Sequence, residues 1–233
     1  MLSTNQQEFQ PLNASGLRPQ IEEQIMSVVL SGQFRPGQRL VESVIAEQLQ
    51  VSRSPVRETL SALEREGIVE YRSRRGYFLI NFTIKDIEEI YSLRQILELN
   101  ALQRVVKQSS NADIAPMQEF VDALGIAVRE RRDYQKIAAL DLSFHQYICQ
   151  LADHSRLFSA WKSMRMQTLL LIGMTSKTEY DYLEQPREFH QDILNAILDR
   201  DLARAEKLLS EHILDAKMRA LAALDNHNRN GQQ

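Results

Sequence analysis

Hydrophobic residues recur with a helical period along most of this chain and alternate in only one short stretch. From residue 17 to 67, and again from 83 to 224, apolar side chains return every three or four positions, as on one face of an α-helix. Between residues 68 and 80 the period falls to two, which is typical of β-strands. The pattern predicts a mainly α-helical protein in which one β-hairpin separates two groups of helices.

The residues before this hairpin predict three helices in succession. A first helix should span residues 17–31 and end at Gly32, and residues 34–38 should form a turn. A second, short helix should span residues 40–49, and a third begins two residues later. The side chains expected to face inward from the first two helices are Ile21, Ile25, Val28, Val29, Val41, Val44, Ile45 and Leu49. Two short helices joined by a tight turn and preceded by another form a helix-turn-helix arrangement.

The third helix, within residues 51–67, combines a buried face with a polar face that carries arginine. Ser52 or Ser54 can accept the free N–H groups of its first turn, where Pro55 is also tolerated. Val56, Leu60 and Leu63 form the inward face, and the outward residues are Arg53, Ser54, Arg57 and Ser61. Small polar residues and arginines at the start of a short helix suit a reader of the DNA major groove. An ordinary solvated amphipathic helix explains these residues almost as well.

The β-hairpin should have four residues at its tip: Ser73, Arg74, Arg75 and Gly76. An exposed tip with adjacent arginines and a glycine suits close approach to phosphate or to a minor groove. Residues 50–80 contain six Arg and four Glu, and the basic residues gather at the helix start and the hairpin tip. A helix-turn-helix followed by such a hairpin is a winged helix, expected over residues 17–80.

The second half of the chain should be an all-α antiparallel helix bundle. The expected helices span residues 84–108, 112–129, 133–151, 155–174, 184–198 and 202–224. Thr83 and Asp201 are the expected N-caps of the first and last of them. Asn81 and Phe82 form the linker, residues 1–16 an N-terminal arm, and residues 175–183 a polar loop. The tail after Asp225 is expected to fray.

Four polar residues of the bundle occupy positions where amphipathic helices normally place apolar ones. Asp141 and His145 are four residues apart, hence on one helical face, and His190 and His212 each lie among aliphatic residues. A single core histidine is usually explained by a hydrogen bond. A divalent metal explains all of them at once, because bundle metal sites use inward ligands from facing helices. Three imidazoles and one carboxylate suit zinc best, with nickel, manganese or iron also possible.

Arg94 and Glu98 repeat this pattern on the first helix of the bundle, since their face also carries apolar residues. One interpretation is a buried ion pair between the two side chains. The other is an effector site, in which Arg94 grips a carboxylate ligand beside the metal. The two interpretations are compatible.

Bulk composition excludes some classes of protein. The net charge of −3 argues against a chain that is basic throughout, although a local basic patch suffices for DNA. Cys149 is the one cysteine, so no internal disulfide can form, and a reducing, cytoplasmic compartment is expected. The longest apolar run, residues 168–174, is too short to cross a bilayer, and no signal peptide is recognised at the N-terminus. We expect no membrane association.

The segment from Ala46 to Leu60, AEQLQVSRSPVRETL, resembles the winged-helix signature of the GntR family of bacterial transcription regulators, together with Leu40 and Glu42 before it and the LEREG of residues 63–67 after it. The second half resembles the FCD ligand-binding domain of the FadR-type subfamily, here over residues 83–225. Its metal-ligand pattern matches Asp141-Leu-Ser-Phe-His145 followed by His190 and His212, and its first helix matches Arg94 and Glu98.

This resemblance implies several functional assignments. It implies operator contacts from Arg53, Ser54 and Arg57, wing contacts around Arg74, Arg75 and Gly76, and a phosphate contact from Ser52. Ser43 stands where relatives can use an arginine on DNA, and His154 where many have asparagine. The family further implies a homodimer that binds a palindromic DNA duplex and responds to a small carboxylate.

We therefore expect a DNA-binding regulator, a repressor rather than an enzyme, controlled by a carboxylate effector at a metal site. Two other functions stay open at this point. A metalloenzyme acting on a small carboxylate would use the same ligands to activate water, but it leaves the winged helix unexplained. In a metal-ion sensor the ion itself would be the signal.

Overall fold

The structure is a computed structural model that describes residues 16–130, 134–176 and 186–230. Residues 1–15 of the expected N-terminal arm and residues 177–183 of the expected polar loop lie outside the described residues. Residues 175–176, expected in that loop, are instead helical. The chain divides into two compact units, residues 1–81 and residues 82–233. No helix in the described part of the chain is both long enough and apolar enough to span a membrane.

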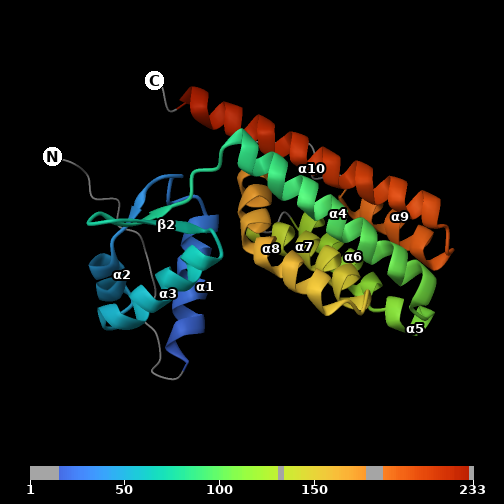
Figure 1. The fold of residues 1–233 in the computed structure, drawn as a ribbon, viewed down its shortest axis with the longest axis horizontal. Helices are drawn as coiled ribbons and strands as arrows, with labels where there is room; N and C mark the ends of the chain where they lie inside the picture. Colours follow the sequence, from blue (N-terminus) through green and yellow to red (C-terminus); the bar gives the residue numbers. More distant parts are fainter. Residues whose placement is uncertain (1–15, 131–133, 177–185, 231–233) are drawn as a thin grey trace. The chain divides into compact units, whose positions relative to one another are not determined.

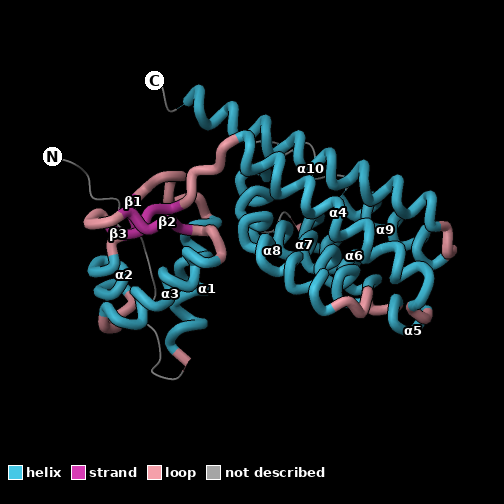
Figure 2. The backbone as a smooth tube through the Cα atoms, viewed as in Figure 1, coloured by secondary structure: helices cyan, strands magenta, loops and turns pink. Residues whose placement is uncertain are grey.

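The first unit combines three helices with a small sheet (Figures 1 and 2). In chain order its elements are α1 (Leu17–Leu30), β1 (Arg39–Leu40), α2 (Glu42–Gln48), α3 (Arg53–Arg65), β2 (Val69–Arg72) and β3 (Gly76–Leu79). The sheet is antiparallel with the order β1-β3-β2. It follows that the unit is the predicted winged helix, with one strand more than the sequence pattern indicated.

The additional strand corrects the prediction for the second helix. Leu40 was expected to begin that helix, but it lies in β1 and pairs with Tyr77 of β3, so α2 begins at Glu42. A two-residue strand is too short to show alternation. Val44 was expected to face inward and is instead 41% exposed, because the later helix start leaves Ile45, Ala46 and Leu49 as the buried residues of this segment.

Helix α3 has the buried face that the sequence predicts. Val56, Leu60 and Leu63 are fully buried, and Gly67 follows the helix with φ of +69°, a backbone conformation that glycine adopts without strain. Ser52 occupies the N-cap position in extended backbone, but its side chain makes no capping hydrogen bond. Neither expected serine cap is therefore formed at α3.

The second unit is a bundle of helices, as predicted (Figure 1). Its elements are α4 (Ile84–Gln108), α5 (Asn111–Ile114), α6 (Met117–Arg129), α7 (Tyr134–Leu151), α8 (Ser155–Ser176), α9 (Pro186–Leu198) and α10 (Leu202–Asn230). Thr83 and Asp86 form a reciprocal capping box at the start of α4, in which each side chain accepts a backbone N–H of the other. The Asp201 carboxylate accepts the Arg204 N–H at 3.0 Å, as expected for the cap of α10.

Two helices of the bundle differ most from those expected. The predicted helix 112–129 is divided into α5 and α6 at Pro116, because proline has no N–H to donate to the preceding turn. Helix α10 continues to Asn230 rather than ending near residue 224, since no proline or glycine interrupts the sequence before Gly231. Helices α4 and α10 lie side by side along the bundle (Figure 1), joined by a 2.6 Å hydrogen bond between Gln95 and Ser210.

Candidate functional site

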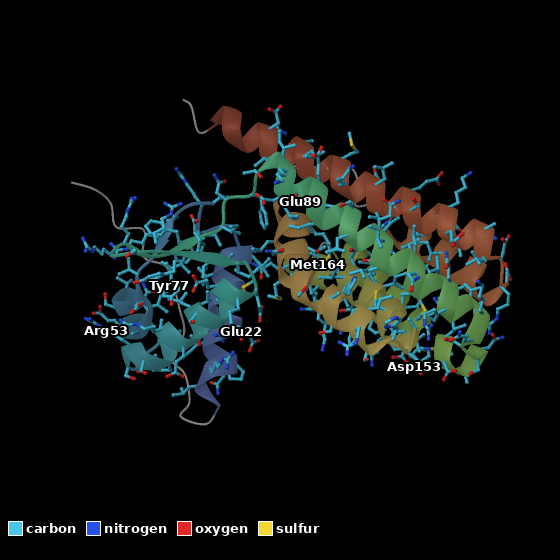
Figure 3. The ribbon with its side chains drawn as sticks, in the orientation of Figure 1. Glu22, Arg53, Tyr77, Glu89, Asp153 and Met164 are labelled. Atoms are coloured by element: carbon cyan, nitrogen blue, oxygen red, sulfur yellow. The ribbon has the colours of Figure 1, made fainter. Side chains whose placement is uncertain are left out.

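The start of α3 carries exposed polar and basic side chains, as the sequence predicts. Ser52, Arg53, Ser54 and Arg57 are all exposed, and Arg53 lies at the edge of the first unit in Figure 3. The Ser54 hydroxyl donates to Glu58 at 3.2 Å on the same helix. Arg53 and Arg57 are therefore accessible to a large ligand such as duplex DNA.

A hollow of about 510 Å³ lies between the start of α3, the start of α2 and the hairpin. Its lining residues are Arg39, Leu40, Val41, Glu42, Ser43, Arg53, Arg57, Tyr71, Arg74, Gly76 and Tyr77. The fold thus brings Arg53 and Arg57 of the helix together with Arg74 and Gly76 of the wing. Ser43, noted above for standing in place of an arginine, also lines it. A concave surface with converging arginines is suited to phosphate and base-edge acceptors.

Arg39 is a basic residue of this hollow that the sequence reasoning missed. It lies in β1, whose pairing with β3 brings it beside the wing. A side-chain carbon built on Gly76 would lie at an ordinary contact distance, 3.6 Å, from the Arg39 guanidinium, so the Arg39 side chain lies next to the wing at this glycine. Arg39 is placed beside the wing by the strand β1, and a strand of two residues is too short to be predicted from the sequence.

The two arginines at the hairpin tip have different surroundings. Arg74 has φ of +60° and lines the hollow. Arg75 lies over the Phe78 ring, with the guanidinium carbon 5.5 Å from its centroid, and Arg72 lies over the same ring at 4.3 Å. Arg75 is nevertheless exposed and remains available to a partner.

In the second unit the four predicted metal ligands converge. Asp141 and His145 come from α7, His190 from α9 and His212 from α10, and their ligand atoms all lie within 4.8 Å of one another. His190 Nε2 is 3.2 Å from Asp141 Oδ1, and His212 Nε2 is 3.7 Å from the same oxygen. The histidines are buried and Asp141 is partly exposed. This is the spacing of donors that could share one small cation.

The hydrogen bonds of His145 orient one of its nitrogens into the cluster. Its Nδ1 lies 2.7 Å from Glu98 Oε2, and a carboxylate there requires the proton on Nδ1. The lone pair is then on Nε2, which lies 3.1 Å from His212 Nε2. A carboxylate behind a ligating imidazole is the usual support of a metal-binding histidine. The donor set therefore fits a transition-metal ion.

The electrostatics of the cluster favour the protonation states that bind metals. Burial lowers the pKa of His145, and burial together with the neighbouring imidazoles lowers that of His212 well below its ordinary value. Burial alone would raise the pKa of Asp141, but its contact with His190 and the surrounding histidines outweigh burial and lower it. Neutral imidazole and ionised carboxylate are the forms that ligate a metal.

Arg94 and Glu98 of α4 form the expected buried ion pair, with 2.6 Å between Arg94 Nε and Glu98 Oε1. The same oxygen accepts the indole N–H of Trp161 at 2.9 Å, a partner that was not predicted from the sequence. Burial would raise the pKa of Glu98, but the Arg94 charge and the donors His145 and Trp161 lower it to about 2. Glu98 is thus a permanently charged acceptor behind His145.

Part of the Arg94 guanidinium makes no hydrogen bond with the described residues. Its Nη1 and Nη2 amino groups are buried and have no hydrogen-bond partner among the described residues, and the same holds for the Tyr91 hydroxyl and for His212 Nδ1. Buried polar groups are normally paired. The Arg94 charge also acts on the pKa of His145 and His212, so the free amino groups lie in the electrostatic range of the cluster. Guanidinium amino groups of this kind are suited to donate to a small anion.

His154, noted above for its place after α7, has a structural role. Its Nδ1 accepts the Leu157 N–H at 3.3 Å, as a cap at the start of α8. Asparagine also caps helices by accepting such an N–H. The histidine therefore satisfies the helix start in this chain.

A winged helix with a basic hollow, followed by a helical bundle with a polar interior, is the architecture of a DNA-binding transcriptional regulator. Comparison with known protein families identifies the kind of regulator. Residues 17–79 match the family described as bacterial regulatory proteins, gntR family, and residues 89–215 match the FCD domain. The chain belongs to the GntR family of transcriptional regulators and carries an FCD domain.

Individual relatives agree with this assignment. The chain is 28% identical over 193 residues to the gluconate operon transcriptional repressor of Bacillus subtilis, covering 81% of this chain and 79% of that one. It is also 28% identical over 137 residues to the HTH-type regulator YdhC of the same organism, covering 59% of this chain and 61% of that one. A solved GntR regulator from Rhodococcus sp. RHA1 has the same fold, with a TM-score of 0.75, 24% identity, and coverage of 88% and 98%.

Proposed function

We propose that this protein is a dimeric transcriptional repressor whose binding to a palindromic operator is controlled by a small carboxylate at a metal site in the bundle. One observation carries the proposal. Four side chains that could ligate a metal and a buried arginine with unpaired amino groups lie together in the interior of the second unit. Together they match the chemistry of a carboxylate bound to a metal.

Asp141, His145, His190 and His212 would hold the ion, with zinc favoured by three imidazoles and one carboxylate, and nickel, manganese or iron as alternatives. When bound, the metal would supply a Lewis-acidic position for one oxygen of the effector. Glu98 keeps His145 in the required tautomer through its 2.7 Å contact. Arg94, held by Glu98 at 2.6 Å, directs its remaining amino groups to the carboxylate.

The winged helix would read DNA through the start of α3 and the wing. Arg53, Ser54 and Arg57 are the proposed contacts to base edges, since they are exposed at the helix end that enters a major groove. The other proposed contacts, which would set the position on the DNA backbone, are Ser52, Arg74, Arg75 and Gly76. The assignment as a repressor is supported by the gluconate operon repressor, which is 28% identical.

The DNA assignment is tested with Arg53→Ala and Arg57→Ala in the full-length protein. The probe is a duplex selected by the wild-type protein from a random-sequence library. Each variant should bind this duplex at least about fivefold more weakly, because a bidentate arginine contact contributes about 1–3 kcal/mol, while circular dichroism remains unchanged. Wild-type affinity in a well-folded variant would refute that residue's contact.

The metal site is tested by measuring bound metal in the wild-type protein and in His145→Asn, His190→Asn and His212→Asn variants. His154→Asn is the matched control, since His154 is exposed and caps α8. The cluster variants should lose the metal, and the control should keep it. Unchanged metal content in the cluster variants would refute the site.

The controlling ligand is identified by measuring affinity for the selected duplex in three states: metal-loaded protein, chelator-treated protein, and metal-loaded protein with mono-, hydroxy- and dicarboxylates. A change that requires both metal and an acid supports the proposal. A change caused by the metal alone would indicate a metal-ion sensor. Consumption of an acid, abolished in His190→Asn, would indicate a metalloenzyme instead.

A further inference from the structure

The guanidinium of Arg57 is held by a carboxylate from the neighbouring helix. Glu42, the first residue of α2, accepts from Arg57 Nε at 3.1 and 3.2 Å and from Nη2 at 2.8 Å. The Arg57 side chain is 67% exposed and that of Glu42 is 20% exposed. The hydrogen bond and charge of Glu42 also raise the pKa of Arg57. An exposed arginine is thereby kept in one orientation before any ligand arrives.

The hydrogen bonds to Glu42 use one edge of the Arg57 guanidinium and leave its other edge available. Glu42 occupies the side edge formed by Nε and one hydrogen of Nη2. The end edge, formed by Nη1 and the outer hydrogen of Nη2, is left facing away from the carboxylate. Two parallel N–H donors at that edge match the O6 and N7 acceptors of guanine in the major groove. The carboxylate therefore determines which edge Arg57 offers to DNA.

The charge of Glu42 matters as much as its geometry. Among the described residues that line the hollow, Glu42 is the acidic one, and four arginines line it too: Arg39, Arg53, Arg57 and Arg74. Phosphates are attracted to such a cluster whatever the base sequence. A carboxylate at this point repels phosphate and partly neutralises Arg57, so it weakens the part of binding that carries no sequence information.

We propose that Glu42 is a specificity-determining residue of the DNA-reading surface, which presents the end edge of Arg57 to a guanine and opposes sequence-independent phosphate binding. This inference rests on the proposed contact between Arg57 and DNA. Pre-orienting the side chain removes part of the ordering entropy that binding would otherwise require. A carboxylate in the first turn also favours the α2 helix, but that effect would not alter preference for one base pair over another.

The test uses full-length Glu42→Gln, the duplex selected by the wild-type protein, and a scrambled duplex of the same composition. The variant should bind the scrambled duplex more tightly, and the ratio of selected to scrambled affinity should fall about tenfold, within the range for one bidentate base contact. The slope of log affinity against log salt concentration on the scrambled duplex should steepen by about one, as for one added phosphate contact.

Two companion variants separate charge from geometry. Glu47→Gln removes the same charge from an exposed position of α2 and should leave both the ratio and the slope at wild-type values. Glu42→Asp keeps the charge on a shorter side chain, so the scrambled affinity should stay low while the preference for the selected duplex weakens. Reselection from the random library should show reduced guanine preference at one position for Glu42→Gln.

Arg57→Ala distinguishes the two ways in which the inference can fail. If Arg57→Ala binds the selected duplex like the wild-type protein, the proposed contact of Arg57 is wrong and the role of Glu42 falls with it. If Arg57→Ala loses the selected duplex while Glu42→Gln behaves like Glu47→Gln, the DNA contact stands and the role of Glu42 alone is overturned.

Discussion

The carboxylate of Glu98 accepts hydrogen bonds from Arg94, Trp161 and His145, which come from three helices of the bundle. It combines a structural task, neutralising a buried arginine, with a functional one, orienting a proposed metal ligand. Substitutions of its different partners can therefore separate the two tasks.

We predict that Glu98→Gln weakens metal binding by about tenfold to a hundredfold, the usual effect of losing the group behind a ligating histidine. It should also lower the free energy of unfolding by about 3–5 kcal/mol, because it leaves the buried Arg94 charge without its counter-ion. Isothermal titration with zinc and urea denaturation measure the two effects.

Trp161→Phe is the control variant, because it removes a hydrogen bond to the same carboxylate and leaves the contact of Glu98 with His145. This variant should reduce stability only. Equal metal affinity in all three proteins would contradict the role of Glu98.

The lowered pKa of His145 and His212 predicts a pH dependence for the metal-free protein. Both groups bind protons near pH 6.5 when unfolded and at lower pH when folded, so the unfolded state gains protons first as the pH falls. The free energy of unfolding should then decrease from pH 7 towards pH 5, by up to about 1.4 kcal/mol per pH unit for each histidine. Glu98 has a pKa of about 2 when folded and an ordinary pKa of 4.5. Its protonation therefore lowers the free energy of unfolding only when the pH falls below about 4.5.

Urea denaturation of chelator-treated protein at pH 5, 6 and 7 measures this dependence. His212→Asn should show about half the slope of the wild-type protein. A flat profile, or a slope unchanged by the substitution, would show that these imidazoles are not kept neutral by the fold.

At the scale of single residues, the four proposed ligands could be selected from the sequence, because Asp141 and His145 share a helical face and the other two histidines lie among aliphatic residues. It could not identify Trp161 or Arg39. The Trp161 contact with Glu98 depends on where an indole on α8 meets α4, and no spacing within one helix encodes that meeting. Contacts between elements were thus the unpredictable part of the candidate sites.

Among the elements, α4 has the clearest link from sequence to structure. Its bounds, 84 to 108, are those that the sequence predicts, because the Thr83 capping box begins the helix. Elsewhere a single residue moved a boundary. Pro116 divides α5 from α6, and the pairing of Leu40 with Tyr77 removes the expected first turn of α2. Strong local signals fixed the helix starts, while short strands depended on partners distant in sequence.

We predict that Thr83→Ala lowers the free energy of unfolding of the bundle by about 1 kcal/mol, the usual contribution of an N-cap side chain. The Thr83 hydroxyl accepts the Asp86 N–H at 3.2 Å, and the Asp86 carboxylate accepts the Thr83 N–H at 2.7 Å. Urea denaturation followed by far-ultraviolet circular dichroism measures the change. Thr83→Ser keeps the acceptor and should unfold like the wild-type protein. An equal loss in both variants would show that the hydroxyl oxygen is not responsible.

At the scale of the whole molecule, the proposed homodimer requires a surface for a second copy. Large apolar side chains are exposed on two adjacent helices of the bundle: Leu93 and Ile96 of α4, and Leu214 and Met218 of α10. Ile96 is 65% exposed and Met218 is 56% exposed. Exposed apolar side chains on adjacent helices are candidates for an interaction site, so we expect the second copy to cover α4 and α10.

We predict that Ile96→Glu or Met218→Glu raises the dimer dissociation constant by about thirtyfold or more, as for the loss of an interface residue that contributes at least 2 kcal/mol. Sedimentation velocity over a concentration series measures the constant. Ile126→Glu is the control, because Ile126 is 46% exposed on α6, away from both helices. A wild-type dissociation constant in both Ile96→Glu and Met218→Glu would place the interface elsewhere.

The unpaired amino groups of Arg94 also bear on how the protein behaves when its effector is scarce. These buried amino groups can donate to any small anion that enters, because a buried polar group is stabilised by a hydrogen-bond partner. On our proposal, the commonest carboxylates of the cell compete for the same guanidinium at lower affinity. The effector concentration that changes DNA binding then rises with the concentration of these competing carboxylates. The regulator therefore responds to the ratio of effector to other carboxylates rather than to the effector concentration alone.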